Sequence, residues 1–157
     1  KVMLKVGDKC PAFTTITETG TTVTNSDYLG AFLIIYFYPK DMTPGCTIES
    51  CGFNKRYAEI KSLGAELLGV SKDSMARHVK FKEKHSLEFS LLVDEEAEIC
   101  NSFGVIQEKS MFGKKYMGIV RSTFLIDPSG KISKIWPKVK ITGHVEDVVK
   151  SLAAASD

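Results

Sequence analysis

The chain has no Cys-x-x-C motif, although its 157 residues include four cysteines, at positions 10, 46, 51 and 100. Disulfide oxidoreductases that exchange thiols with other proteins carry their two cysteines in that motif, so the sequence disfavours this class of enzyme. The four cysteines also form no obvious disulfide framework for a domain of this size. A reducing compartment is therefore expected.

A strong charge bias is missing as well. The formal net charge is +2, which gives no reason to expect a nucleic-acid-binding or membrane-binding surface. No apolar run approaches the roughly 20 residues needed to cross a bilayer. The first four residues, Lys-Val-Met-Leu, contain no apolar h-region, so we expect no export signal. These absences favour the cytoplasm, or a plastid if a transit peptide has been removed.

Metal-ligand spacing is also absent from the sequence. His78, His85 and His144 show no zinc-site spacing with the cysteines. We therefore expect no metal, and no residue pattern calls for a haem, a flavin or another cofactor.

Hydrophobic periodicity and turn residues predict strands that alternate with helices. The expected strands cover residues 13–17, 21–24, 31–38, 65–70, 89–93, 118–126 and 131–136. The expected helices cover residues 44–62, 74–84, 95–103 and 145–155, and residues 107–115 read as a polar loop. Without an internal repeat or a linker, this pattern predicts one α/β domain over residues 1–157, with a mixed sheet covered by helices and a late antiparallel hairpin.

Cys46 occupies a position that favours reactivity. The apolar run 31–38 predicts a buried strand, and Thr43-Pro44 fits an N-cap followed by proline at the first helical position. Cys46 would then lie in the first turn of a helix, just beyond the carboxyl end of a central strand. Free amides and the helix dipole favour a thiolate there, and Pro39 and Pro44 stiffen the approach to it. The alternative is an inert thiol in a helix that Thr43 only caps.

A second cysteine, Cys51, cannot bond to Cys46 across an intact helix. Cα atoms five residues apart on a helix are about 8–9 Å from each other, whereas a disulfide needs roughly 4.4–6.8 Å. A bond between these cysteines therefore requires the first turns of the helix to unwind. The spacing disfavours a permanent bridge and allows one that forms after Cys46 has been oxidised.

These residues resemble those of a known family. The segment Asp-Met-Thr-Pro-Gly-Cys-Thr-Ile-Glu-Ser-Cys at 41–51 is similar to the active-site signature of peroxiredoxins. Its second cysteine, together with Arg-Ser-Thr-Phe-Leu-Ile-Asp at 121–127, matches the bacterioferritin comigratory protein (peroxiredoxin Q) branch. The resemblance covers nearly the whole chain. It implies a thioredoxin-like fold with an added N-terminal β-hairpin.

The resemblance also implies an activity, the thiol-dependent reduction of hydrogen peroxide and organic hydroperoxides. Cys46 would attack the peroxide and become a sulfenic acid, and Cys51 would resolve it as an intramolecular disulfide. Thioredoxin, or glutaredoxin, would then reduce the disulfide. A chain that resolves its own sulfenic acid can act as a monomer or a weak homodimer.

Further residues receive roles from the same resemblance. Thr43, Gly45 and Arg121 would bind the peroxide oxygens beside Cys46, and Arg121 would also stabilise the thiolate. Glu49 would orient this arginine. An arginine in an otherwise apolar strand needs a partner in any case. The alternative for Arg121 is therefore a structural ion pair with Glu49.

The remaining thiols, Cys10 and Cys100, are expected to be unpaired and structural, with Cys100 as a reserve candidate for the resolving cysteine. A non-catalytic function also stays open. A redox sensor or holdase would use the same disulfide as a conformational switch, and slow turnover with oxidation-dependent partner binding would favour it.

Overall fold

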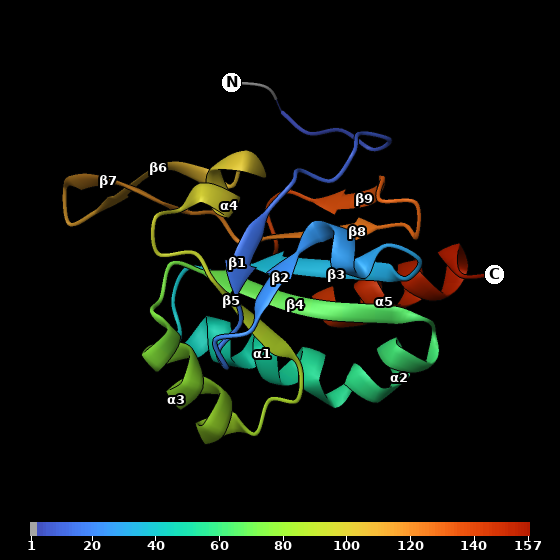
Figure 1. Ribbon diagram of the computed structural model, residues 1–157. Helices are drawn as coiled ribbons and strands as arrows, with labels where there is room; N and C mark the ends of the chain where they lie inside the picture. Colours follow the sequence, from blue (N-terminus) through green and yellow to red (C-terminus); the bar gives the residue numbers. More distant parts are fainter. Residues whose placement is uncertain (1–2) are drawn as a thin grey trace.

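A five-stranded mixed sheet forms the centre of the computed structural model, which describes residues 3–157 (Figure 1). The sheet order is β5 (Ser90–Val93), β4 (Ala65–Ser71), β3 (Phe32–Phe37), β8 (Ser122–Ile126) and β9 (Ile132–Trp136). The strands β3, β4 and β5 run parallel, whereas β8 and β9 are antiparallel to their neighbours. The predicted mixed sheet is confirmed.

Two hydrophobic layers cover the sheet, because successive side chains of a strand point to opposite faces. From β3, Ile34 and Tyr36 enter one layer, and Leu33 and Ile35 enter the other. The helices are α1 (Pro44–Lys55), α2 (Tyr57–Ser62), α3 (Met75–His85), α4 (Glu98–Ser102) and α5 (His144–Ala155). Figure 1 shows α1, α2 and α3 on one side of the sheet and α4 on the other. Buried residues of α5 belong to the same layer as those of α1, α2 and α3.

The N-terminal hairpin is present as predicted. It pairs β1 (Thr14–Ile16) with β2 (Thr22–Thr24) in antiparallel register, and the 3-10 helix η1 (Asn25–Tyr28) leads from it towards β3. Lys1 and Val2, to which the expectation of no export signal refers in part, lie outside the described residues.

The helices within residues 3–157 are all too short or too polar to cross a membrane.

Two predicted helices differ from those in the structure. The helix expected over 44–62 is interrupted at Arg56, whose φ of −102° and ψ of 3° separate α1 from α2. The helix expected over 95–103 is only α4, because Ala97 adopts a positive φ of 58°. Asp94 still caps that helix, since its carboxylate accepts the N–H groups of Ile99 and Cys100.

The polar loop predicted over 107–115 is wrong. The chain forms a second hairpin there, from β6 (Ile106–Met111) and β7 (Lys114–Ile119), with Phe112 and Gly113 at positive φ in a two-residue turn. The strand predicted over 118–126 is likewise two strands, because Val120 and Arg121 interrupt it between β7 and β8. This interruption separates Arg121 from regular strand pairing.

Candidate active site

Cys46 lies where the sequence predicted it, in the first turn of α1 and beyond the carboxyl end of β3. Thr43 stands at the N-cap with an extended backbone, and Pro44 follows at the first helical position. The predicted N-cap position is confirmed, but the Thr43 side chain makes no cap hydrogen bond, because its hydroxyl donates to the Lys40 carbonyl oxygen at 2.8 Å. First-turn amides have no acceptor within the helix. Those of Gly45 and Cys46 are therefore placed to favour negative charge beside the sulfur.

The guanidinium of Arg121 contacts the Cys46 sulfur directly. Its Nη2 donates to Cys46 Sγ at 3.3 Å, although 75 residues separate the two in the sequence. The Cys46 side chain is only 1% exposed, so little water screens this contact. A permanent cation at hydrogen-bond distance stabilises the thiolate form of a cysteine.

Glu49 holds the other branch of the same guanidinium. Arg121 Nη1 donates to Glu49 Oε1 at 2.7 Å, and the carboxylate is fully buried. Burial raises the pKa of Glu49 to about 7, against the lowering effect of Arg121. Burial alone would lower the pKa of Arg121, but the charges of Glu49 and then Cys46 raise it, and the net effect is a raised pKa. The ion pair expected as a structural alternative therefore exists, and it fixes the arginine against the sulfur.

Gly45 provides the space for this arginine. A Cβ at position 45 would lie 3.3 Å from Arg121 Nη2 and 3.1 Å from Ile141 Cδ1. Both contacts are tighter than ordinary van der Waals packing, so the glycine allows the guanidinium to approach the start of α1.

Gly45→Ala should lower the rate constant for oxidation of reduced protein by hydrogen peroxide, because the new methyl group displaces Arg121 from Cys46. We expect a loss of about tenfold, given how strongly rates depend on sub-ångström placement. Stopped-flow single-turnover kinetics would measure it. Gly52→Ala is the control, since its Cβ would contact Val145 in α5 rather than the arginine. An unchanged rate in Gly45→Ala would show that Arg121 has room to adjust.

Sequence reasoning missed a neighbour of Glu49, His144 at the start of α5. Its Nε2 lies 2.8 Å from Thr123 Oγ1 and 3.9 Å from Glu49 Oε2. The latter oxygen is buried and has no hydrogen-bond partner within residues 3–157. Burial lowers the pKa of His144 to about 4, so the ring is neutral at pH 7. A lone histidine beside Val145 carried no signal of this contact.

His144→Gln should make the protein less sensitive to acid. A histidine whose pKa is lower in the folded state contributes stability above its unfolded pKa of about 6.5 and loses it as the pH falls towards 4. Urea unfolding at pH 7.5 and 4.5 should therefore show a decrease in free energy of unfolding that is smaller by about 2 kcal/mol in the variant. His85→Gln on α3 should retain the wild-type decrease. Equal decreases in all three proteins would contradict the assignment.

The structure separates the four cysteines, all of which are free thiols. Cys46 and Cys51 both lie in α1, so the helical separation of about 8–9 Å applies to them. Cys100 belongs to the hydrophobic layer on the opposite face of the sheet from Cys46. Burial, and then Asp94, raise the pKa of its thiol, while burial raises the pKa of Cys10 to about 11.

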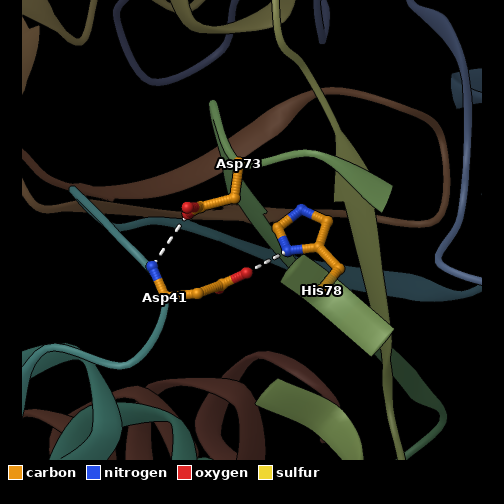
Figure 2. A group of neighbouring side chains, drawn as sticks. All are labelled: Asp41, Asp73 and His78. Atoms are coloured by element: carbon orange, nitrogen blue, oxygen red, sulfur yellow. Dashed lines mark hydrogen bonds and ion pairs between the residues drawn. The ribbon is translucent and has the colours of Figure 1, made fainter. Parts of the chain in front are cut away.

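Metal-ligating groups gather at one place in the described part of the chain. Ligand atoms of Asp41, Asp73 and His78 all lie within 4.8 Å of one another (Figure 2). Each of these atoms already has a protein hydrogen-bond partner, which for Asp73 Oδ1 is the guanidinium of Arg77. The cluster is therefore a hydrogen-bond network rather than an open ligand set.

Comparison with known proteins supports the same chemistry. A model of the AhpC/TSA family matches residues 6–135. Peroxiredoxin Bcp from Bacillus subtilis is 47% identical over 154 residues, which cover 98% of each chain. The bacterioferritin comigratory protein of Xanthomonas campestris, studied for its alkyl peroxide reduction activity, has 42% identity and a TM-score of 0.88 over 92% of each chain. A cysteine-to-serine mutant of PrxQ from Xylella fastidiosa has 37% identity and a TM-score of 0.94 over 100% of each chain.

These similarities extend over nearly the whole chain, and the solved structures share its fold. The predicted thioredoxin-like fold is thereby confirmed. The chain belongs to the AhpC/TSA family, in its bacterioferritin comigratory protein (peroxiredoxin Q) branch, and is a thiol-dependent peroxidase.

Proposed function

We propose that Cys46 is the peroxidatic cysteine of this thiol peroxidase. The observation that carries the proposal is the forked contact of Arg121, whose two terminal nitrogens bond the Cys46 sulfur and the Glu49 carboxylate. A fork fixed by a buried carboxylate presents its other branch at a constant position. Such a donor stabilises charge as it develops in the transition state, without reorganisation.

The first step is attack of the Cys46 thiolate on the terminal oxygen of a hydroperoxide. An S–O bond forms and the O–O bond breaks, which leaves a sulfenic acid and an alkoxide or hydroxide that takes up a proton from water. Arg121 and the free amides of Gly45 and Cys46 would stabilise the departing oxygen. Because Thr43 donates its own proton to Lys40, its oxygen is left to accept the O–H of the peroxide.

The second step is condensation of Cys51 with the sulfenic acid, which releases water and forms the Cys46–Cys51 disulfide. The first turns of α1 must unwind for this, because an intact helix holds the two cysteines too far apart. Cys100 is the poorer candidate, since it is buried in the layer across the sheet. No second chain is needed, so a monomer or a weak homodimer suffices.

The disulfide must be reduced by an external dithiol protein, for which we propose thioredoxin, with glutaredoxin as the alternative. Reduction of this kind fits a cytoplasmic location. The relatives compared above are bacterial, and they give no support to a plastid.

Oxidation of the reduced protein with one equivalent of peroxide tests the assignment of Cys46. Hydrogen peroxide and cumene hydroperoxide would each be mixed with wild type, Cys46→Ser and the control Cys10→Ser. Intact-mass analysis and peptide mapping would then identify the oxidised residue. Wild type and Cys10→Ser should react fast at Cys46, and Cys46→Ser should lose the fast reaction. Fast oxidation at another cysteine in wild type would overturn the assignment.

A further inference from the structure

The loop that leads into α1 is tied down by a buried polar network around Asp41. This residue is fully buried, although it lies in a loop. Its Oδ1 accepts a hydrogen bond from the Tyr38 hydroxyl at 2.5 Å, and its Oδ2 lies 2.6 Å from His78 Nδ1 (Figure 2). Buried carboxylates are costly unless they are paired in this way.

The main chain of Asp41 is held as well. Its N–H donates to Asp73 Oδ2 at 2.8 Å, and its carbonyl oxygen accepts from Arg77 Nη2 at 3.3 Å. Figure 2 shows Asp73 and His78 meeting Asp41 from separate segments. These two and Arg77 come from the turn after β4 and from α3. One loop residue is therefore fixed through both its side chain and its backbone.

The surroundings of His78 favour protons on both ring nitrogens. Nε2 lies 2.8 Å from the Leu92 carbonyl oxygen, which can only accept, so this nitrogen is a donor. Nδ1 faces the Asp41 carboxylate, and a second donor there makes the ring an imidazolium. Burial works against that charge, but the hydrogen bond and the charge of Asp41 raise the pKa of His78.

The other charged groups of the network are Asp73 and Arg77, and the charge of Asp73 adds to the rise in the pKa of His78. Arg77 Nε pairs with Asp73 Oδ1 at 2.8 Å, so Asp73 already has its own cation. His78 is then the residue that pairs with the Asp41 carboxylate, in the loop that leads into α1.

This pair lies close to the reacting residues along the chain. Asp41 precedes Thr43 by two residues and Cys46 by five. The Thr43 hydroxyl donates back to Lys40, and Met42 between them has a positive φ of 70°, which is uncommon for a residue other than glycine. A turn of this shape keeps its geometry only where surrounding contacts fix it.

Resting on the proposed role of Cys46, we propose that His78 is a positioning residue of the peroxidase. Its contact with Asp41 holds the loop over residues 40–45 so that Thr43 and the first turn of α1 meet the peroxide in reacting geometry. A misplacement of about 1 Å can cost as much as 100-fold in rate. Loss of the contact should therefore slow the oxidation of Cys46 by peroxide even at temperatures at which the protein remains fully folded.

Two substitutions of His78 separate positioning from general stability. In His78→Asn the amide nitrogen stands near the place of Nδ1 and can still donate to Asp41. In His78→Gln it stands near the place of Nε2 and can donate to Leu92 but not to Asp41. Single-turnover oxidation by hydrogen peroxide should be about tenfold slower in His78→Gln and within about threefold of wild type in His78→Asn. His78→Gln should lower the thermal midpoint more than His78→Asn, because it leaves the buried Asp41 carboxylate without this partner. The rates are therefore compared at a temperature at which both variants are fully folded.

Equal rates in the two folded variants would overturn the proposal. A second measurement needs no variant: long-range ¹H–¹⁵N spectra of wild type labelled at histidine should show both nitrogens of His78 protonated at pH 7. An Nδ1 without a proton would also overturn it, because His78 would then not donate to Asp41. Peptide mapping of oxidised wild type keeps the two proposals apart, because a wrong assignment of Cys46 would appear there whatever His78 does.

Discussion

Arg121→Lys should slow the reaction of the reduced protein with hydrogen peroxide by about 100-fold, which is the usual cost of removing one donor that stabilises a developing negative charge. The wild-type guanidinium bonds Cys46 and Glu49 with two different nitrogens. A lysine ammonium is a single point charge on a flexible stem, and it lacks the rigid fork that holds both partners. The buried Glu49 would therefore compete with the sulfur for one cation.

Stopped-flow oxidation of Arg121→Lys, with excess peroxide and without a reductant, measures this rate constant. Arg56→Lys is the matched control, because Arg56 pairs with Glu59 at the surface and should leave the rate within about twofold of wild type. Thermal unfolding of both variants would show that the site is folded. If Arg121→Lys reacted as fast as wild type, the role of Arg121 would be only structural, as the ion-pair partner of Glu49. That is the alternative stated from the sequence.

The position of Cys46 could be predicted because its signals are local. An apolar run ended by a proline, followed by Thr43-Pro44, specifies a strand, a loop and the start of a helix within fifteen residues. Cys51 follows at a spacing that helix geometry interprets directly. Each of these inferences depends on neighbours in the sequence, and the structure places Cys46 in the first turn of α1.

The hairpin of β6 and β7 was missed for a physical reason. Most of its side chains are exposed, so neither face needs the alternation of polar and apolar residues by which a half-buried strand is recognised. A two-residue turn with positive φ usually contains Asn-Gly or Asp-Gly, whereas this one is Phe112-Gly113. The break at Val120 and Arg121 was missed as well, because no turn residue marks it in the sequence. This break places Arg121 between the hairpin and the central sheet.

The partners of the site were missed for another reason, since they come from distant segments. His144 meets Thr123 across 21 residues, and His78 meets Asp41 across 37. A single sequence contains no record of such pairs. Asp41 was part of the recognised signature, but only the fold shows that it is fully buried and held by residues after β4.

Cys51→Ser should lower steady-state peroxide turnover with thioredoxin by about 100-fold, while the first oxidation of Cys46 stays within about threefold of wild type. Attack on the peroxide involves groups around Cys46, none of which the substitution removes. Without Cys51, however, the sulfenic acid has no thiol on the same helix with which to condense. An NADPH-coupled thioredoxin assay measures turnover, and stopped-flow oxidation measures the first step.

Cys100→Ser is the matched control, since it removes the other candidate for resolution and should leave turnover unchanged. The structural reason is the sheet itself. Cys46 lies in the layer that contains α1 and α5, and Cys100 lies in the layer on the other face. A bond between them would require one thiol to leave its layer and pass the buried strand β3, whereas Cys51 needs only the unwinding of the turns that α1 places between the two cysteines. Loss of turnover in Cys100→Ser with full turnover in Cys51→Ser would reverse the assignment and require the larger rearrangement.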